Sequence, residues 1–401
     1  MEIFTNTNYD FLKWRFHAIA FSLVFILIGG AMYLKNGLNL GIDFAGGANV
    51  ILKFKEAVPI DQLRSQIPGA TIQQYGKPEE RSVLIRLPKQ KQEGDYAGQV
   101  VEKLNKAMNP ASSSQLDLNF QGRAALAELL KSTDPDKKGS STAAHQYYYD
   151  LAQNVIERRS ELGIFTDMAQ VTSAPGLSKE AAAVLPQNAF LGAFNILSQE
   201  TVGPQVGREL QTKAFWAIIL ATLAMGLYIA IRFDLKFGVA AVLCLVHDVL
   251  IGLAFMGLIN GEFEIITVAA FLMIIGYSIN DTVVVYDRVR ENVKKSRTRE
   301  NFETLMNRTL NQTLSRTVLT GGCVVLILIS LILFGGEVIN QFAWLLLIGT
   351  LAGTYSTLFV VPAIVMVWNE RIANRSGAKR AEVVRREAAP IETATPGRAK
   401  G

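Results

Sequence analysis

The sequence has 401 residues, of which 50% are hydrophobic, and Lys and Arg outnumber Asp and Glu by 40 to 35. Several apolar runs are long enough to cross a hydrocarbon core of about 30 Å, which predicts an integral membrane protein. The two cysteines, Cys244 and Cys323, lie in apolar runs without Cys-x-x-Cys spacing. We therefore expect two free thiols, and neither a disulfide framework nor a zinc site.

Six apolar segments are the predicted membrane-spanning helices. They cover residues 17–34, 214–232, 237–259, 263–286, 315–335 and 342–368. A polar N-terminus of residues 1–16 precedes the first segment, and a basic tail of residues 369–401 follows the last. The first apolar stretch is long, and "GGAMYLKNG" after it is a poor match to a cleavage site, so we expect an anchor rather than a cleaved signal peptide.

The distribution of Lys and Arg predicts the orientation. Basic residues occur before the first span, between spans two and three, between spans four and five, and after the sixth. The alternate short loops carry none, so the positive-inside rule places both termini in the cytoplasm. This topology and anionic headgroups account for the formal net charge of +5. We therefore expect the basic run "KKSRTR" to lie near anionic lipid headgroups rather than to bind nucleic acid.

The large loop, residues 35–213, is predicted to form an extracytoplasmic domain. Strand patterns occur at "GANVILKF", "ATIQQYG", "RSVLIRL" and "FNILSQETVG", and helical patterns at "PIDQLRSQI" and "YAGQVVEKLNKAM". The order β-α-β-β-α-β is that of a ferredoxin-like α+β domain. A helical insertion occupies about residues 110–190, and its segment "KSTDPDKKGSST" is expected to be a turn-rich, mobile connector.

Ionisable residues inside the predicted spans mark the candidate functional site. They are His247 and Asp248 in the third span, Asp281 in the fourth, and Arg316 at the start of the fifth. A charge at the bilayer centre costs several kcal/mol, so such side chains usually face a protein interior or a water path. Arg316 enters from the same predicted side as Asp281, and we expect the two to form a pair.

Asp281 is open to two interpretations. It could be a static partner of Arg316 or of a neighbouring helix. Alternatively it could carry protons, with burial and the Arg charge balancing its two protonation states. The second is favoured because intramembrane acids are functional hypotheses by default. Ser278, Asn280 and Thr282 add polar atoms beside it. Asp248 could equally be a second relay step or a helix-packing contact.

Two glycine-rich stretches connect the predicted domain to the membrane. In "GIDFAGG", Gly41, Gly46 and Gly47 surround Asp43 and Phe44 where the first span meets the first strand. Glycine permits backbone conformations and close approaches that other residues forbid, so we expect a tight hinge. No Lys-Ser or Lys-Thr follows, which argues against a phosphate-binding loop. "TVGPQVGREL" is the matching element on the return path, and together they predict two struts coupling domain and bundle.

The segments "GIDFAGG", "VGPQVGREL", "LVHDV" and "GYSINDTVVVYDRVREN", followed by "QTLSRTV" and "LFGG", resemble the signature segments of the SecD/SecF family. That family belongs to the bacterial Sec protein-export machinery and is related to the resistance-nodulation-division transporters. The resemblance covers about 320 of the 401 residues, and the "SINDT" form favours the SecF branch. The insertion and the basic tail depart from the family pattern.

The resemblance implies a subunit that, with SecD, uses the proton-motive force to assist translocation of unfolded preprotein through the SecY channel. It implies a place in the bacterial cytoplasmic membrane. By motif position, Asp281 corresponds to the family's essential membrane aspartate, Arg316 to its arginine on the next span, and "GIDFAGG" to its first outer element. A hypothesis follows in which proton loading at Asp281 weakens its attraction to Arg316, shifts the helices and moves the outer domain.

Other classes of function were weighed on the same residues. With only three histidines, neither a Ser-His-Asp pattern nor a metal cluster is readable, so we expect no enzyme, no cofactor and no metal. A proton-coupled small-molecule or lipid exporter of the same superfamily is one alternative, although it normally has twelve spans in one chain. A passive scaffold of the channel is the other, and in it Asp281 would be a structural pair.

Overall fold

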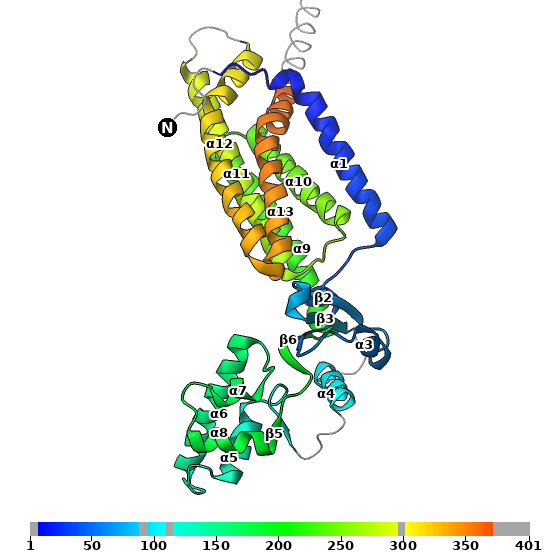
Figure 1. Cartoon of the computed structure of the whole chain (residues 1–401). Helices are drawn as coiled ribbons and strands as arrows, with labels where there is room; N and C mark the ends of the chain where they lie inside the picture. The colour runs from blue at the N-terminus through cyan, green and yellow to red at the C-terminus, as the bar shows by residue number, and fades with distance from the viewer. Residues whose placement is uncertain (1–6, 88–94, 110–114, 296–300, 372–401) are drawn as a thin grey trace, which may run out of the picture.

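The computed structural model describes residues 7–87, 95–109, 115–295 and 301–371. A long helical bundle carries a smaller domain at one end, and the start of α1 (Arg15–Asn36) lies at the opposite end (Figure 1). We call these the domain end and the terminal end of the bundle. The predicted basic tail lies outside the described residues from position 372 onward, as do residues 1–6 of the predicted N-terminus.

Six described helices are long and apolar enough to cross a membrane, which confirms the predicted polytopic fold. They are α1 with the 3-10 turn Leu12–Trp14 before it, α9 (Pro204–Arg232), α10 (Leu235–Leu258), α11 (Ile265–Lys295), α12 (Phe302–Phe334), and α13 (Gly336–Tyr355) with its continuation to Arg371. Several begin outside the predicted apolar windows. Polar first turns extend α9 and α12 beyond the lipid-like segment, because helix formation does not require apolar side chains.

The last helix changes its winding near its middle. A π-helical turn covers Ser356–Val360, two residues before Pro362. Proline has no backbone N–H, so the carbonyl of Leu358 has no α-helical donor and the local winding relaxes. The turn places the hydroxyls of Ser356 and Thr357 in the interior of the bundle, where both residues are fully buried.

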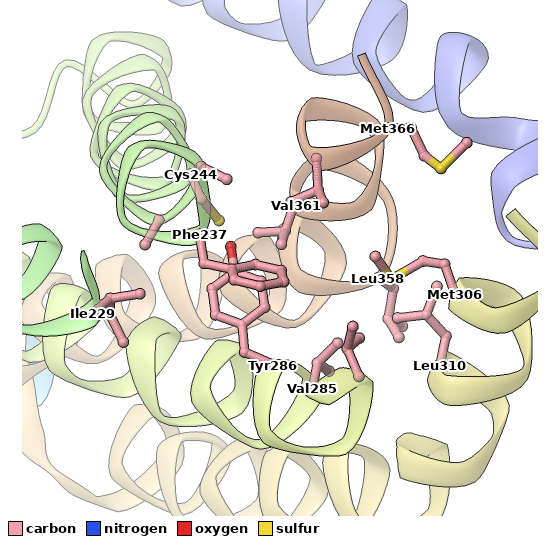
Figure 2. Close-up of a cluster of buried hydrophobic side chains, with 14 of the residues drawn as sticks. Ile229, Phe237, Cys244, Val285, Tyr286, Met306, Leu310, Leu358, Val361 and Met366 are labelled. Atoms are coloured by element: carbon pink, nitrogen blue, oxygen red, sulfur yellow. The ribbon is translucent and has the colours of Figure 1, made fainter. Parts of the chain in front are cut away.

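A buried apolar cluster holds the terminal halves of the helices together (Figure 2). It draws side chains from α9, α10, α11, α12 and the continuation of α13; those labelled are Ile229, Phe237, Cys244, Val285, Tyr286, Met306, Leu310, Leu358, Val361 and Met366. The rings of Tyr286 and Phe237 lie 4.5 Å apart between centroids. Five segments therefore share one core, and a shift of one helix changes the contacts of the others.

The domain contains the predicted ferredoxin-like unit. Its strands are β1 (Gly47–Phe54), β2 (Thr71–Tyr75), β3 (Ser82–Leu87) and β6 (Phe194–Val202), in the sheet order β2-β3-β1-β6. All neighbours are antiparallel, and α3 (Ile60–Gln66) and α4 (Tyr96–Met108) contribute to the apolar core on one face. Alternate residues of β1 are buried in this core, as a half-buried strand requires. The predicted strand and helix order is confirmed.

The insertion forms a second, helical unit with its own core. Its elements are β4 (Leu116–Asp117), α5 (Arg123–Thr133), α6 (Thr142–Leu162), α7 (Met168–Thr172), α8 (Lys179–Asn188) and β5 (Ala189–Phe190). The connector between α5 and α6 is turn-rich as expected, but hydrogen bonds hold it in place. The Asp134 carboxylate accepts from the backbone of Lys138 and Gly139 and from the Tyr148 hydroxyl, at 2.6 Å for the last.

Candidate functional site

The "GIDFAGG" motif is bonded directly to the helix that carries Asp281. Its short helix α2 (Ile42–Ala45) places Asp43 against the first residue of α11. The backbone N–H of Ile265 donates to Asp43 Oδ2 at 2.9 Å. The first N–H groups of a helix have no partner inside the helix, and a carboxylate there also interacts favourably with the helix dipole. Asp43 therefore caps α11 from a segment that leads into β1 and the domain at that end of the bundle.

Backbone hydrogen bonds strengthen the same connection. The segment between α1 and α2 pairs with the loop between α10 and α11 in a short parallel bridge. The Gly41 N–H donates to the Phe263 carbonyl at 2.9 Å, and the Phe263 N–H donates to the Asn39 carbonyl at 2.8 Å. Because these bonds join backbone to backbone, movement of the outer end of α11 displaces the start of the motif with it.

Two glycines allow α2 to pack on α9. A Cβ atom at Gly207 would lie 2.8 Å from the Phe44 carbonyl oxygen, and one at Gly46 would lie 3.0 Å from Pro204 Cα. Gly46 also has a φ of +74°, a conformation that favours glycine. The Gln211 side chain donates to the Phe44 carbonyl at 3.1 Å. The two glycine-rich stretches are therefore in contact, and larger side chains would separate them.

A charged cluster fills the space between the sheet and the domain end of the bundle. Arg86 on β3 pairs with Glu262, in the loop between α10 and α11, at 2.6 Å. The side chain of Glu264 packs against Gly41, where a Cβ would lie 2.4 Å from Glu264 Cγ. Burial raises the pKa of Glu264, and the nearby carboxylates of Glu262 and Asp43 raise it further, while Arg86 acts in the opposite direction. The junction is thus polar, with more carboxylates than cations around Glu264.

Asp281 lies near the middle of α11 and is only 1% exposed. Its Oδ1 accepts a hydrogen bond of 3.4 Å from Thr320 on α12, and its Oδ2 is buried without a partner in the described part of the chain. The expected pair with Arg316 is not formed as a direct contact. Arg316 lies one turn before Thr320 on α12 and is exposed, so the register of α12 places a hydroxyl, not the guanidinium, against Asp281.

Asp248 on α10 is also fully buried, but its carboxylate is well satisfied. Ser278 Oγ on α11 donates to it at 2.5 Å, and Ser356 Oγ in the π-helical turn donates at 3.0 Å. His247 Nδ1 lies 2.9 Å from its other oxygen. Three elements of the bundle therefore meet at one carboxylate.

Hydroxyl contacts connect the two carboxylates through α11. Ser278, which binds Asp248, precedes Asp281 by less than one helical turn. Thr282 Oγ1 lies 3.1 Å from Thr357 Oγ1 in the π-helical turn. Gly353 permits the close approach, because a Cβ there would lie 3.1 Å from Ser278 Cβ. The carboxylates thus share one polar layer across α10, α11 and α13.

An open pocket lies beside this layer toward the terminal end. It has a volume of about 570 Å³ and is lined by residues of α9, α11 and α12. Asn280, the neighbour of Asp281, and Arg316 both line it. Asn280 is exposed although the flanking residues of α11 are buried. The polar site therefore adjoins a route toward the terminal end of the bundle.

Several residues of the site were not singled out in the sequence. Ser356 and Thr357 lie in "TYSTLFVVP", where the polar residues and the proline six positions after Ser356 were the available signal. Thr320 and the capping contact of Asp43 depend on which helices meet, and no local pattern encodes this. In the described ranges, no group of three or more His, Cys, Asp and Glu side chains has the geometry to hold a metal ion.

Two family descriptions match the chain. Residues 184–371 match "Protein export membrane protein SecD/SecF, C-terminal", and residues 34–58 match "SecD/SecF GG Motif". The chain is 36% identical over 393 residues to a protein translocase subunit SecF of Koribacter versatilis, covering 94% of this chain and 96% of the relative. It is 35% identical to the same subunit of Calditerrivibrio nitroreducens, covering 91% and 96%.

Relatives named SecDF and their solved structures also match the chain. A protein translocase subunit SecDF of Thermus thermophilus is 45% identical over 184 residues, covering 46% of this chain and 25% of the relative. A crystal structure of SecDF, a translocon-associated membrane protein from the same genus and species, has a TM-score of 0.62 and 28% identity. That match covers 91% of this chain and 39% of the other, so the chain spans about two fifths of the solved protein.

Proposed function

The chain belongs to the SecF family of protein translocase subunits, and from this premise we propose that proton binding and release at Asp281 drives motion of its outer domain. The family membership makes it an accessory, multi-pass subunit of the Sec machinery in the inner membrane. Its relatives are named as transport components rather than catalysts. The exporter and scaffold alternatives are not favoured by these relatives.

The observation that carries the proposal is the incomplete bonding of Asp281. A buried carboxylate oxygen without a partner is costly when ionised, and the cost falls when the group binds a proton. Among the residues that the structure describes, a long hydrogen bond from Thr320 is the only one to the carboxylate. Little bonding therefore has to be broken for Asp281 to change its charge, which is what a proton carrier requires.

The cap on α11 supplies a path from Asp281 to the outer domain. A charge change at Asp281 alters how α11 packs against α12, and Asp43 is bonded to the domain end of the same helix. The motif then leads directly into β1. Each proton that moves down a membrane potential releases about 2.3 kcal/mol per 100 mV.

Arg316 and Asp248 take different parts in this proposal. Arg316 lies in the open pocket, where its charge favours the ionised form of Asp281 without a direct contact. Asp248 accepts from Ser278 and from Ser356, and so anchors α11 to α10 and to the π-helical turn. We therefore assign Asp248 to the helix-packing interpretation and keep Asp281 as the proton carrier.

The partners follow from the family. SecD is the natural partner, because relatives exist in which the two subunits form one SecDF chain. We place both termini in the cytoplasm, consistent with the basic loops at the terminal end. The outer domain then faces the side where a translocating preprotein leaves the SecY channel. Contacts with unfolded substrate would be weak and without sequence preference.

The test compares Asp281→Asn with the wild type, both assembled with SecD, in inverted vesicles that complete translocation of a trapped preprotein. An imposed proton gradient should accelerate completion in the wild type. In the variant, the part of the completion rate that depends on the gradient should vanish, while the part that does not depend on it persists. Assembly with SecD, measured by blot and co-purification, is the control for folding.

Two further variants separate the alternatives. Asp281→Glu keeps a titratable group, so the completion of translocation should still depend in part on the gradient. Thr320→Val removes the hydrogen bond that the structure describes to Asp281, and the completion of translocation should still depend on the gradient. If Asp281→Asn responds to the gradient as the wild type does, the carboxylate is structural, and the subunit acts as a passive scaffold.

A further inference from the structure

The open pocket beside Asp281 contains charged groups that the proposed cycle has not used. Besides apolar and amide side chains, its lining residues include Arg232, Asp287, Arg288, Glu291 and Arg316. Arg232 comes from α9 and Arg316 from α12, and the other three come from α11. The pocket lies toward the terminal end, which the proposed topology places at the cytoplasm. Because Asn280, the neighbour of Asp281, lines it, the pocket is a candidate route for a proton leaving Asp281 inward.

One face of α11 runs through the pocket. Asn280 and Asp287 are seven residues apart, or about two helical turns, so they lie on the same face roughly 10 Å apart. Both are exposed and both line the pocket. Asn280 is adjacent to Asp281, and Asp287 lies farther toward the terminal end. The face thus leads from the buried carboxylate to an exposed one.

The two pocket carboxylates differ in their bonding. Glu291 pairs with Arg288 and with Lys295, each at 2.5 Å, and Arg288 also donates to Gln312 at 2.8 Å. Asp287 has no hydrogen bond or ion pair with any residue that the structure describes. Among these groups, Asp287 is the carboxylate whose oxygens are free to accept a proton.

Cations line the pocket together with Asp287. Arg232 and Arg316 form no ion pair in the described ranges, and both line the pocket with Asp287. Tyr228, the other titratable lining residue, lies on α9.

We propose that Asp287 is a proton-relay residue at the cytoplasmic mouth of the pocket, accepting the proton that Asp281 releases. This inference rests on the proposed function of Asp281. In the step, the O–H bond of the Asp281 carboxyl breaks, the proton passes along water in the pocket, and a new O–H bond forms at Asp287. The proton then leaves for the cytoplasmic buffer. Charge is conserved, and no oxidant, reductant or further reactant takes part.

Inverted vesicles provide a direct test because their cytoplasmic face meets the external medium. The complex with SecD carries either Asp287→Asn, Asp287→Glu, or the matched control Glu370→Gln. Glu370 is an exposed carboxylate at the same end of the bundle, outside the pocket. Gradient-driven completion of translocation is measured at low and at high concentration of MES, a membrane-impermeant buffer. A mobile buffer can replace a missing proton acceptor at an open mouth, but it cannot repair a structural defect.

At low buffer, Asp287→Asn should lose most of the gradient-dependent acceleration, and high buffer should restore it. Asp287→Glu and Glu370→Gln should match the wild type at both concentrations. The exit-site proposal is overturned if Asp287→Asn matches the wild type at low buffer, or if its defect is unchanged by buffer.

Asp281→Asn in the same assay separates the exit-site proposal from the proposed function of Asp281. If it loses the gradient response and Asp287→Asn does not, only the exit site fails; if Asp281→Asn keeps the response, the proposed function fails as well.

Discussion

The two buried carboxylates of the bundle have similar burial and opposite bonding. Asp248 is 0% exposed and Asp281 is 1% exposed, so both lack contact with solvent. Asp248 has two serine hydroxyls and a histidine nitrogen around it, whereas Asp281 has one long hydrogen bond and one oxygen without a described partner. Burial alone therefore does not identify a proton carrier. Bonding separates an anchor, which loses several contacts on changing charge, from a carrier, which loses few.

The largest expected difference between the two is in stability. Asp248→Leu would remove the acceptor of Ser278, the partner of His247 Nδ1 and one of the two acceptors of Ser356, and each unsatisfied buried group costs about 1–3 kcal/mol. We expect a loss of about 3 kcal/mol or more in the free energy of unfolding. Asp281→Leu removes one weak bond and one unpartnered oxygen, so its change should be within about 1 kcal/mol.

Chemical or thermal unfolding of the purified subunits in detergent measures both variants under one condition. Leu346→Ala, at a buried apolar position on the neighbouring helix α13, provides a reference for the loss of apolar packing. Equal destabilisation by Asp248→Leu and Asp281→Leu would remove the distinction between anchor and carrier.

A smaller effect is expected where α11 meets the outer domain. Asp43→Ala removes the cap on Ile265, and loss of a capping side chain typically costs about 1 kcal/mol. The loss of gradient-driven translocation should be larger than this change in stability suggests, because the substitution weakens the connection between Asp281 and the outer domain. Gradient-driven translocation should fall while Asp43→Asn, which keeps an acceptor oxygen, retains most of it. A normal response of Asp43→Ala would show that the cap does not transmit the motion.

The smallest expected effect is a pH dependence at the junction. The pKa of Glu264 is raised by burial and by the carboxylates of Glu262 and Asp43. Burial is the largest cause of the raised pKa, so a docked state in which Glu264 is buried binds the proton more tightly than a separated state in which it meets water, while Arg86 of the docked sheet opposes part of this effect. Docking should therefore strengthen as the pH falls through the raised pKa and weaken above it.

Spin labels on the outer domain and on the bundle, with the distance distribution recorded against pH, test this effect. Glu264→Gln should hold the docked distance across the range, since it mimics the protonated form. The junction contains no pH-sensitive contact of this kind if the wild-type distances do not change with pH.

Much of the architecture could be predicted from local patterns. The four strands and two helices of the ferredoxin-like unit have strong alternation or helical spacing, and each was found at its predicted place. Asp248 and Asp281 were visible because a charge in an apolar run has few structural explanations. "GIDFAGG" was expected to connect domain and membrane, and its contacts with α9 and α11 agree with that expectation.

The features that separate the two carboxylates were not predictable in this way. The absence of a direct Asp281–Arg316 contact depends on the register of α12 against α11, which places Thr320 at the site. Ser356 reaches Asp248 only because the helix widens into a π turn before Pro362. The cap by Asp43 joins positions far apart in the chain. Each depends on tertiary packing, which no window of sequence contains.

The most direct test of the central claim is infrared difference spectroscopy of the complex with SecD across a pH change. Protonated carboxyl groups absorb apart from ionised ones, so a group that exchanges its proton produces a difference band. The account predicts a band that is lost in Asp281→Asn and present in Asp248→Asn. A band that persists in Asp281→Asn and disappears in Asp248→Asn would contradict it and make Asp248 the proton carrier.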